Sequence, residues 1–154
     1  MKIFFEAIET GDLETVLMFL EAGIDPNIEN HYGNTALHIA VECEQLSIIR
    51  LLLDVGVDPN IRNYWQKTPL FHIFSDNYEI ANLLLAAGAD PNIRDYRSET
   101  PLYKYIYPGY TKTSELLLLS GANPNVKNFE GHPPLLYFTD DVETIRLLYR
   151  YGAK

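Results

Sequence analysis

The sequence has little cysteine, few basic residues and no long apolar run, and each shortage excludes a class of protein. Cys43 is the one cysteine among 154 residues, so an internal disulfide is impossible and a reducing cytosol suits the chain. The runs LLLAAGA and LLLLSGA are too short to span a bilayer. The start, MKIFFEAIET, reaches Glu6 before the apolar core of a secretory signal can form. We therefore expect a cytoplasmic protein with no membrane segment.

Positive charge is scarce as well. The chain has 12 Lys and Arg against 21 Asp and Glu, a formal net charge of −9. Nucleic acid is not an expected partner, because its phosphate backbone dominates affinity and repels an acidic protein. Within residues 1–33, Lys2 is the one basic residue among the acidic residues Glu6, Glu9, Asp12, Glu14, Glu21, Asp25 and Glu29. This acidic end is either a solubilising cap, which we favour, or a docking site for a basic partner.

Patterns of catalytic residues are missing too. The histidines at 31, 38, 72 and 132 include no pair at i, i+4 with a glutamate between them. Cys43 stands at no spacing from a histidine that suggests a nucleophile or a metal ligand. No glycine-rich phosphate loop occurs. We expect no enzymatic activity, no cofactor and no metal.

What the sequence has instead is an internal repeat. GIDPNI, GVDPNI, GADPNI and GANPNV begin at Gly23, Gly56, Gly88 and Gly121, in steps of 33, 32 and 33 residues. Each follows a leucine-rich helical run. Each precedes, at a constant interval, a second motif: NTALHIA (34–40), KTPLFHI (67–73), ETPLYKY (99–105) or HPPLLYF (132–138). A period of this length predicts stacked structural repeats that share one core.

These motifs resemble the ankyrin repeat over essentially the whole chain. The residues that carry the resemblance are the helix starts 35–38, 68–70 and 100–102 and the turns, of which Gly88-Ala89-Asp90-Pro91-Asn92 is the best copy. The resemblance implies an all-α repeat fold, an ankyrin-type solenoid of antiparallel helix pairs joined by protruding β-hairpin loops. It also implies that His38 braces neighbouring loops.

The repeats give a single domain over 1–154. We expect an N-terminal cap repeat at 1–26, full repeats at 27–59, 60–91 and 92–124, and a truncated C-terminal cap repeat at 125–154, which together form a complete small array. Thr35, Thr68 and Thr100 should be helix N-caps, and Pro69 and Pro101 should occupy the first helical position. The glycines after the helical runs should adopt left-handed helix-ending conformations.

The segment YKYIYPGYT, residues 103–111, departs from the family pattern. Where the family usually has alanine, the successive repeats have Ala40, Ile73, Tyr105 and Phe138. We expect Tyr105 to enter the core, with the small residues Thr113 and Ser114 making room for its ring and their hydroxyls binding its phenol.

Tyr107 and Tyr110 flank Pro108-Gly109, so we expect them near an exposed turn. The tyrosine cluster as a whole either fills core space left by small residues on the partner helix, which we favour, or forms a binding surface.

The tips of the expected hairpins carry a row of rings. We call these tips the fingers: ENHYGN (29–34), RNYWQK (62–67), RDYRSE (94–99) and KNFEGH (127–132). Exposed Trp, Tyr and Arg are typical of protein–protein hot spots. The alternative is that each ring packs on the neighbouring finger, which we expect least of Trp65 because Tyr64 cannot point the same way. The predicted partner-binding residues are His31, Tyr32, Tyr64, Trp65, Lys67, Tyr96, Arg97 and Phe129, extended by Tyr107 and Tyr110.

The sequence thus predicts a non-catalytic protein-interaction module that uses its fingers and concave face. The fingers are less acidic than the rest of the chain, which favours an acidic or mixed segment of an unidentified protein partner. Because nearly all of the chain is repeat, we expect it to block or sequester that partner, as a viral or bacterial factor acting on a host would. The alternative is a small-molecule or enzymatic role for Tyr103–Tyr110. We expect a monomer, with self-association through the last repeat as the other possibility.

Overall fold

The computed structural model describes residues 1–106, 110–134 and 141–154. Within these ranges the regular elements are helices: α1 (Lys2–Thr10), α2 (Leu13–Glu21), α3 (Ala36–Glu42), α4 (Leu46–Asp54), η1 (Pro69–His72, a 3₁₀-helix), α5 (Tyr78–Ala86), α6 (Pro101–Tyr105), α7 (Thr111–Leu119) and α8 (Val142–Arg150). The predicted all-α ankyrin-type fold is confirmed.

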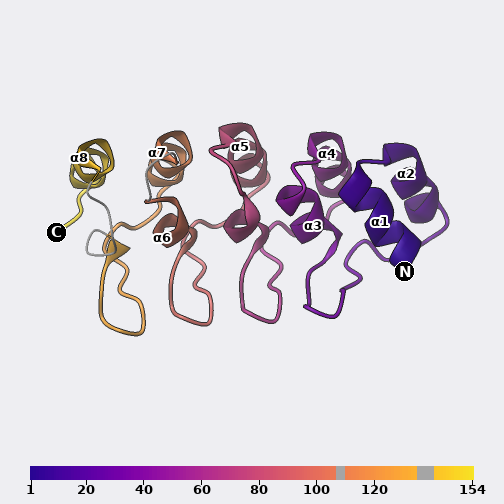
Figure 1. Cartoon of the computed structure of the whole chain (residues 1–154), viewed down its shortest axis with the longest axis horizontal. Helices are drawn as coiled ribbons and strands as arrows, with labels where there is room; N and C mark the ends of the chain where they lie inside the picture. The colour runs from indigo at the N-terminus through magenta and orange to yellow at the C-terminus, as the bar shows by residue number, and fades with distance from the viewer. Residues whose placement is uncertain (107–109, 135–140) are drawn as a thin grey trace.

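The helices stack in two rows, and the fingers project from one side of the stack (Figure 1). The inner row, next to the fingers, contains α1, α3, η1 and α6; the outer row contains α2, α4, α5, α7 and α8. The two ends of the chain lie at opposite ends of the stack. Each repeat therefore contacts its neighbours in sequence, as expected of a solenoid. We call the surface of the inner row beside the fingers the inner face.

The predicted helix ends are present. Pro69 and Pro101 each occupy the first turn of a helix, directly after Thr68 and Thr100. At the end of α4 the chain turns at Gly56, whose φ of 89° is left-handed. There the Gly56 N–H donates to Leu53 O and the Val57 N–H donates to Leu52 O, which satisfies carbonyls that the helix itself leaves open.

The turn asparagines connect one repeat to the next. Asn60 Nδ2 donates to Gly88 O at 3.0 Å, and Asn60 Oδ1 accepts from the Asp90 N–H at 2.7 Å. Asn92 and Asn125 form the same pair of bonds one and two repeats later. The side chains of these asparagines thus bind the backbone of the following repeat.

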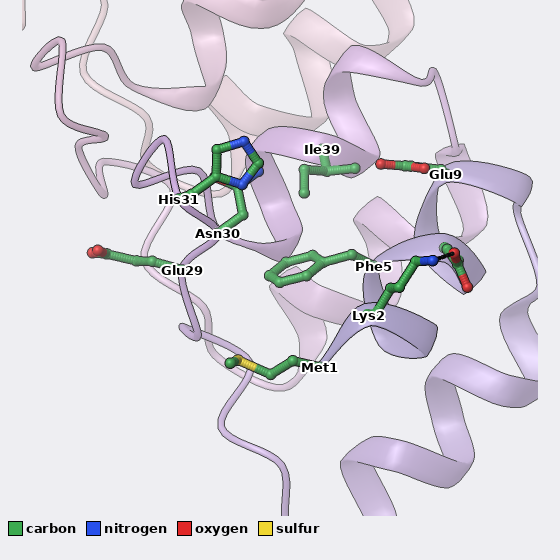
Figure 2. Close-up of a pocket in the computed structure, with 9 residues that line it drawn as sticks. Met1, Lys2, Phe5, Glu9, Glu29, Asn30, His31 and Ile39 are labelled. Carbon is green, nitrogen blue, oxygen red and sulfur yellow. Dashed lines mark ion pairs between the residues drawn. The ribbon is translucent and has the colours of Figure 1, made fainter.

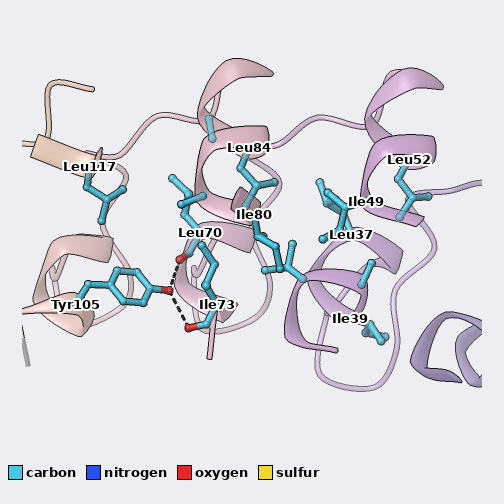
Figure 3. Close-up of a cluster of buried hydrophobic side chains, with 14 of the residues drawn as sticks. Leu37, Ile39, Ile49, Leu52, Leu70, Ile73, Ile80, Leu84, Tyr105 and Leu117 are labelled. Atoms are coloured by element: carbon cyan, nitrogen blue, oxygen red, sulfur yellow. Dashed lines mark hydrogen bonds between the residues drawn. The ribbon is translucent and has the colours of Figure 1, made fainter. Parts of the chain in front are cut away.

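One apolar core runs through the stack (Figure 3). It includes Leu37, Ile49, Ile80, Leu84 and Leu117, all of which are fully buried. No repeat could bury these side chains alone, so the stability of each repeat depends on its neighbours.

The first helix of the middle repeat is cut short. Where α3 runs for seven residues, η1 has four, and Ile73 then leaves the helix with φ −70° and ψ 120°. The large ring of Tyr105 is fully buried beside this segment, at the position where the family usually has alanine. The Tyr105 ring thus occupies the space beside the point where η1 ends, and its hydroxyl bonds to Ile73 O there.

Side chains from the following repeat satisfy the carbonyls that the short helix leaves open. The Tyr105 hydroxyl lies 2.6 Å from Leu70 O and 3.2 Å from Ile73 O (Figure 3). Lys104 Nζ donates to Phe71 O at 2.7 Å, and the Tyr110 hydroxyl donates to Phe74 O. Burial raises the pKa of Tyr105 well above its usual value and lowers the pKa of Lys104 to about 8.

The tyrosines of the cluster that the structure describes, Tyr103, Tyr105 and Tyr110, each bind backbone carbonyls, which agrees with the architectural role favoured from the sequence. The partners of the Tyr105 phenol, however, are backbone carbonyls and not the hydroxyls of Thr113 and Ser114. Both of these residues are buried, and the Ser114 hydroxyl donates instead to Tyr105 O. The expectation was wrong about the acceptor because it did not anticipate that η1 ends early and leaves carbonyls free.

We predict that Tyr105→Phe lowers the free energy of unfolding by about 1–3 kcal/mol, because two buried carbonyls lose their hydroxyl partner while the ring remains. The measurement is urea denaturation followed by circular dichroism. Tyr149→Phe, at an exposed position on α8, is the matched control and should unfold like the wild type. Equal stability of Tyr105→Phe and the control would contradict the role assigned to the hydroxyl.

Candidate functional site

Each finger is closed by a side chain at its base. Asn63 Oδ1 accepts from the backbone N–H groups of Trp65 and Lys67, both at 3.0 Å. The same pair of bonds recurs at Asn30, Asp95 and Asn128. A short polar side chain that bonds to the backbone two and four residues ahead fixes a tight turn. This column of asparagine and aspartate thus gives all the fingers one shape.

The fingers are also hydrogen-bonded to one another. The Tyr96 N–H donates to Trp65 O at 3.1 Å, and the Phe129 N–H donates to Arg97 O at 3.0 Å. Between the first two fingers, the Tyr64 N–H lies 3.4 Å from Tyr32 O. The backbone of each finger tip after the first is therefore held by the finger before it.

Two arginines strengthen this connection. Arg62 Nε donates to Gln66 O within its own finger, and its Nη2 donates to Arg94 O in the next. Arg94 repeats the pattern with Ser98 O and Lys127 O. Their guanidinium groups keep their charge at the surface while they cross-link the row.

The first ring of each finger is exposed. Tyr64 and Phe129 are each 66% exposed, Tyr96 is 56% exposed, and His31 is exposed as well. Tyr64 also lies on the preceding finger: a Cβ atom added to Gly33, whose φ is 73°, would be 2.3 Å from Cδ1 of the tyrosine. A ring here thus packs on its neighbour on one side and faces solvent on the other.

The residue that follows the first ring of each finger is exposed as well. Trp65 stacks on Tyr32 with ring centroids 5.7 Å apart and an interplanar angle of 28°, and remains 42% exposed. The sequence favoured Trp65 as the ring least engaged in packing, whereas the structure gives it an aromatic partner. Both rings of the second finger thus lie against the first finger, Tyr64 at Gly33 and Trp65 at Tyr32. Arg97 Nε donates to the Tyr96 hydroxyl at 2.9 Å.

The structure thus places most of the predicted partner-binding residues in one row. Lys67 lies at the base of its finger, half-buried, with Nζ 5.9 Å from the centre of the Phe71 ring. Tyr110 lies apart from the row, half-buried at the start of α7, with its hydroxyl bound to Phe74 O. Tyr107 falls outside the described residues. We call the joined set the finger row: His31, Tyr32, Tyr64, Trp65, Tyr96, Arg97 and Phe129.

The finger row is braced from below by His38. Its Nδ1 accepts from the Thr35 N–H at 3.2 Å, so its Nε2 carries the proton and donates to Lys67 O at 3.0 Å. This confirms the bracing role that the family resemblance implied. Burial, together with the nearby His72 ring, lowers the pKa of His38 to about 4.

A tyrosine performs the same function two repeats later. Tyr103, aligned with His38, hydrogen-bonds to His132 O of the following finger. The intervening repeat has Phe71 at this position, which has no donor. Without an imidazole to bind, the buried Thr68 and Thr100 hydroxyls have no hydrogen-bond partner in the described part of the chain. The sequence showed the substitutions but not that tyrosine replaces histidine in function.

A hollow on the inner face was not predicted as a site. It lies between α1, α3 and the first finger, has a volume of about 420 Å³, and is lined by Phe5, Ile39 and several acidic residues (Figure 2). The sequence signal that could have indicated it is the pair Phe4-Phe5, since one face of α1 can bury only one of two adjacent rings. Phe4 is fully buried, and Phe5 is left half-buried at the floor of the hollow.

The described residues contain no group of three or more His, Cys, Asp or Glu that could hold a metal ion. In the same part of the chain, no helix is both long and apolar enough to cross a membrane. The hydroxyls of Tyr103, Tyr105 and Tyr110 already bind backbone carbonyls, so none of them supports the small-molecule alternative for this region.

Two family models match the chain. One, described as ankyrin repeats in three copies, matches residues 4–95, and the other, described as an ankyrin repeat, matches residues 98–129. Proteins with such repeats are generally protein–protein interaction modules and are typically non-catalytic. No curated protein matches the chain.

We predict that His38 makes the stability of the fold depend on pH between about 6.5 and 4. In this window His38 binds a proton in the unfolded chain but not in the folded chain. The contribution of His38 to the free energy of unfolding is therefore fully present above the window and is lost as the pH drops through it. From pH 7 to pH 4 the wild type should lose about 3 kcal/mol more than His38→Gln, in which the amide can still accept from the Thr35 N–H.

The measurement is urea denaturation at a series of pH values. His31→Gln, which removes an exposed imidazole, is the control for the loss of a histidine as such. A constant difference in stability between the wild type and His38→Gln from pH 7 to pH 4 would contradict the prediction.

Proposed function

Because the chain belongs to the ankyrin repeat family, whose repeats generally mediate protein–protein interaction, we propose that it binds a protein partner through the finger row. The observation that carries this proposal is the line of exposed rings held on cross-linked fingers. Trp, Tyr and Arg dominate the energy of protein interfaces, and the row combines all three.

The rigidity of the row supports high affinity. Each finger is closed by its own asparagine or aspartate and is hydrogen-bonded to the finger before it. Side chains that are already ordered lose less entropy on association, so more of the contact energy is available for binding. Arg62, Arg94 and Arg97 make the fingers less acidic than the rest of the chain, and an acidic or mixed segment of the partner complements them.

The proposed use of this binding is to block or sequester the partner. Matches to the family cover residues 4–95 and 98–129, so repeats occupy most of the chain and binding is the activity that they supply. A partner surface covered by the finger row is closed to other proteins. We propose the cytosol as the place of action and a viral or bacterial factor directed at a host protein as the biological setting.

We predict that Tyr64→Ala/Tyr96→Ala/Phe129→Ala reduces capture of the partner at least about tenfold, because it removes the exposed rings without touching the core. The measurement is affinity capture from lysate with quantitative mass spectrometry, using wild-type chain as bait.

The matched control is Tyr78→Ala/Leu119→Ala/Tyr149→Ala, which truncates three exposed side chains on the outer row. It should capture the same protein as the wild type. Circular dichroism checks that both variants fold. Equal capture by the finger variant and the control would mean that the rings are packing elements only.

A further inference from the structure

The hollow beside the first finger has an apolar floor. Phe5 reaches into it from α1 and Ile39 from α3, while Met1 closes one edge (Figure 2). Met1 is 71% exposed, and Phe5 is half-buried against the core. A volume of about 420 Å³ accommodates one or two side chains of a bound segment, but not a folded domain.

The rim of the hollow is acidic. Glu6, Glu9 and Glu29 stand around it with a single lysine, Lys2, whose Nζ lies 3.5 Å from Glu6 Oε1. Among the described residues, no cation pairs with Glu9 or Glu29. Glu9 extends from α1 toward Ile39, whereas Glu29 extends from the first finger away from Phe5 (Figure 2). The rim thus carries exposed carboxylates on two opposite sides of the apolar floor, one on α1 and one on the first finger.

The acidic character continues along the inner face and then ends. A second hollow of about 220 Å³ shares Glu9, Asn30 and Ile39 with the first and adds Glu42. Beyond it, the hollow at the base of the later fingers is lined by Lys67, Arg97 and Lys104 together with Asp95 and Glu99. A basic side chain therefore finds complementary charge at the first hollow, where carboxylates outnumber cations.

From this combination we propose that the hollow between α1 and the first finger binds an arginine or lysine side chain beside an apolar residue of the partner. The inference rests on the proposed function and specifies the chemistry of the bound segment. The stem of a long basic side chain packs on Phe5 and Ile39 while its charged group reaches Glu9 or Glu29. A guanidinium over the Phe5 ring gains a cation–π contact as well. An acidic segment is repelled from the same site.

The test uses a defined probe, the capped peptide acetyl-Gly-Arg-Leu-Arg-Gly-amide, titrated into the ¹⁵N-labelled chain at low salt. We expect saturable shifts of the amide signals around the hollow at millimolar peptide. The analogue with Glu in place of both Arg residues should not bind, and the analogue with Gly in place of Leu should bind more weakly, because it cannot use the apolar floor.

Glu9→Gln/Glu29→Gln should weaken binding of the Arg-Leu-Arg peptide about two- to tenfold, as expected for the loss of two exposed charge pairs. Glu21→Gln/Asp54→Asn removes the same charge from the ends of α2 and α4, away from the hollow, and should bind like the wild type. The proposal is overturned if no saturable shift occurs, if the two double variants bind alike, or if the acidic peptide binds equally well.

The finger variant of the preceding section separates this inference from the proposed function. Its hollow is unchanged, so it should bind the peptide as the wild type does. If the partner is captured through the finger row while the peptide fails to bind, the finger row stands and the hollow is rejected. If the peptide binds at the hollow but the finger variant still captures the partner, the finger-row assignment fails and the hollow stands.

Discussion

The hydrogen bonds that cross from one repeat to the next are the interaction on which the rest of this structure depends. A repeat of two short helices leaves carbonyls open at its helix ends and loops, and buried carbonyls must be paired. Here the neighbouring repeat supplies the donors: His38 for Lys67 O, Asn60 for Gly88 O and Tyr105 for Leu70 O. These bonds fix the spacing and orientation of the repeats, and the apolar core fills the space that remains.

This dependence explains how the array tolerates departures from the family pattern. Tyr103 replaces a histidine and still reaches the following finger, because its hydroxyl is a donor at the end of a long rigid side chain. Tyr105 replaces a small residue beside the short η1, and its hydroxyl satisfies carbonyls that this helix leaves open. The substitutions still have a cost, since the buried Thr68 and Thr100 hydroxyls are without hydrogen-bond partners in the described residues.

The residues that hold the fingers in shape differ from the exposed rings at the finger tips. The asparagine and aspartate side chains, the backbone bonds between fingers and the arginine cross-links determine the shape of the fingers. The rings at their tips remain exposed, even where they also pack on the preceding finger. The shape of the fingers therefore rests on side chains and backbone groups other than the exposed rings.

The sequence by itself determined the period, the fold class, the helix starts and the positions of the fingers. These features follow from local signals, since proline, glycine and asparagine restrict the backbone within a few residues. Each signal also recurs in several repeats at a constant period. Only the tertiary structure decided that Trp65 stacks on Tyr32, that Tyr105 binds the carbonyls of η1, and that Phe5 and Ile39 form the floor of a hollow. These pairs lie about one repeat apart in sequence, and whether their side chains meet depends on the distance and rotation between neighbouring repeats.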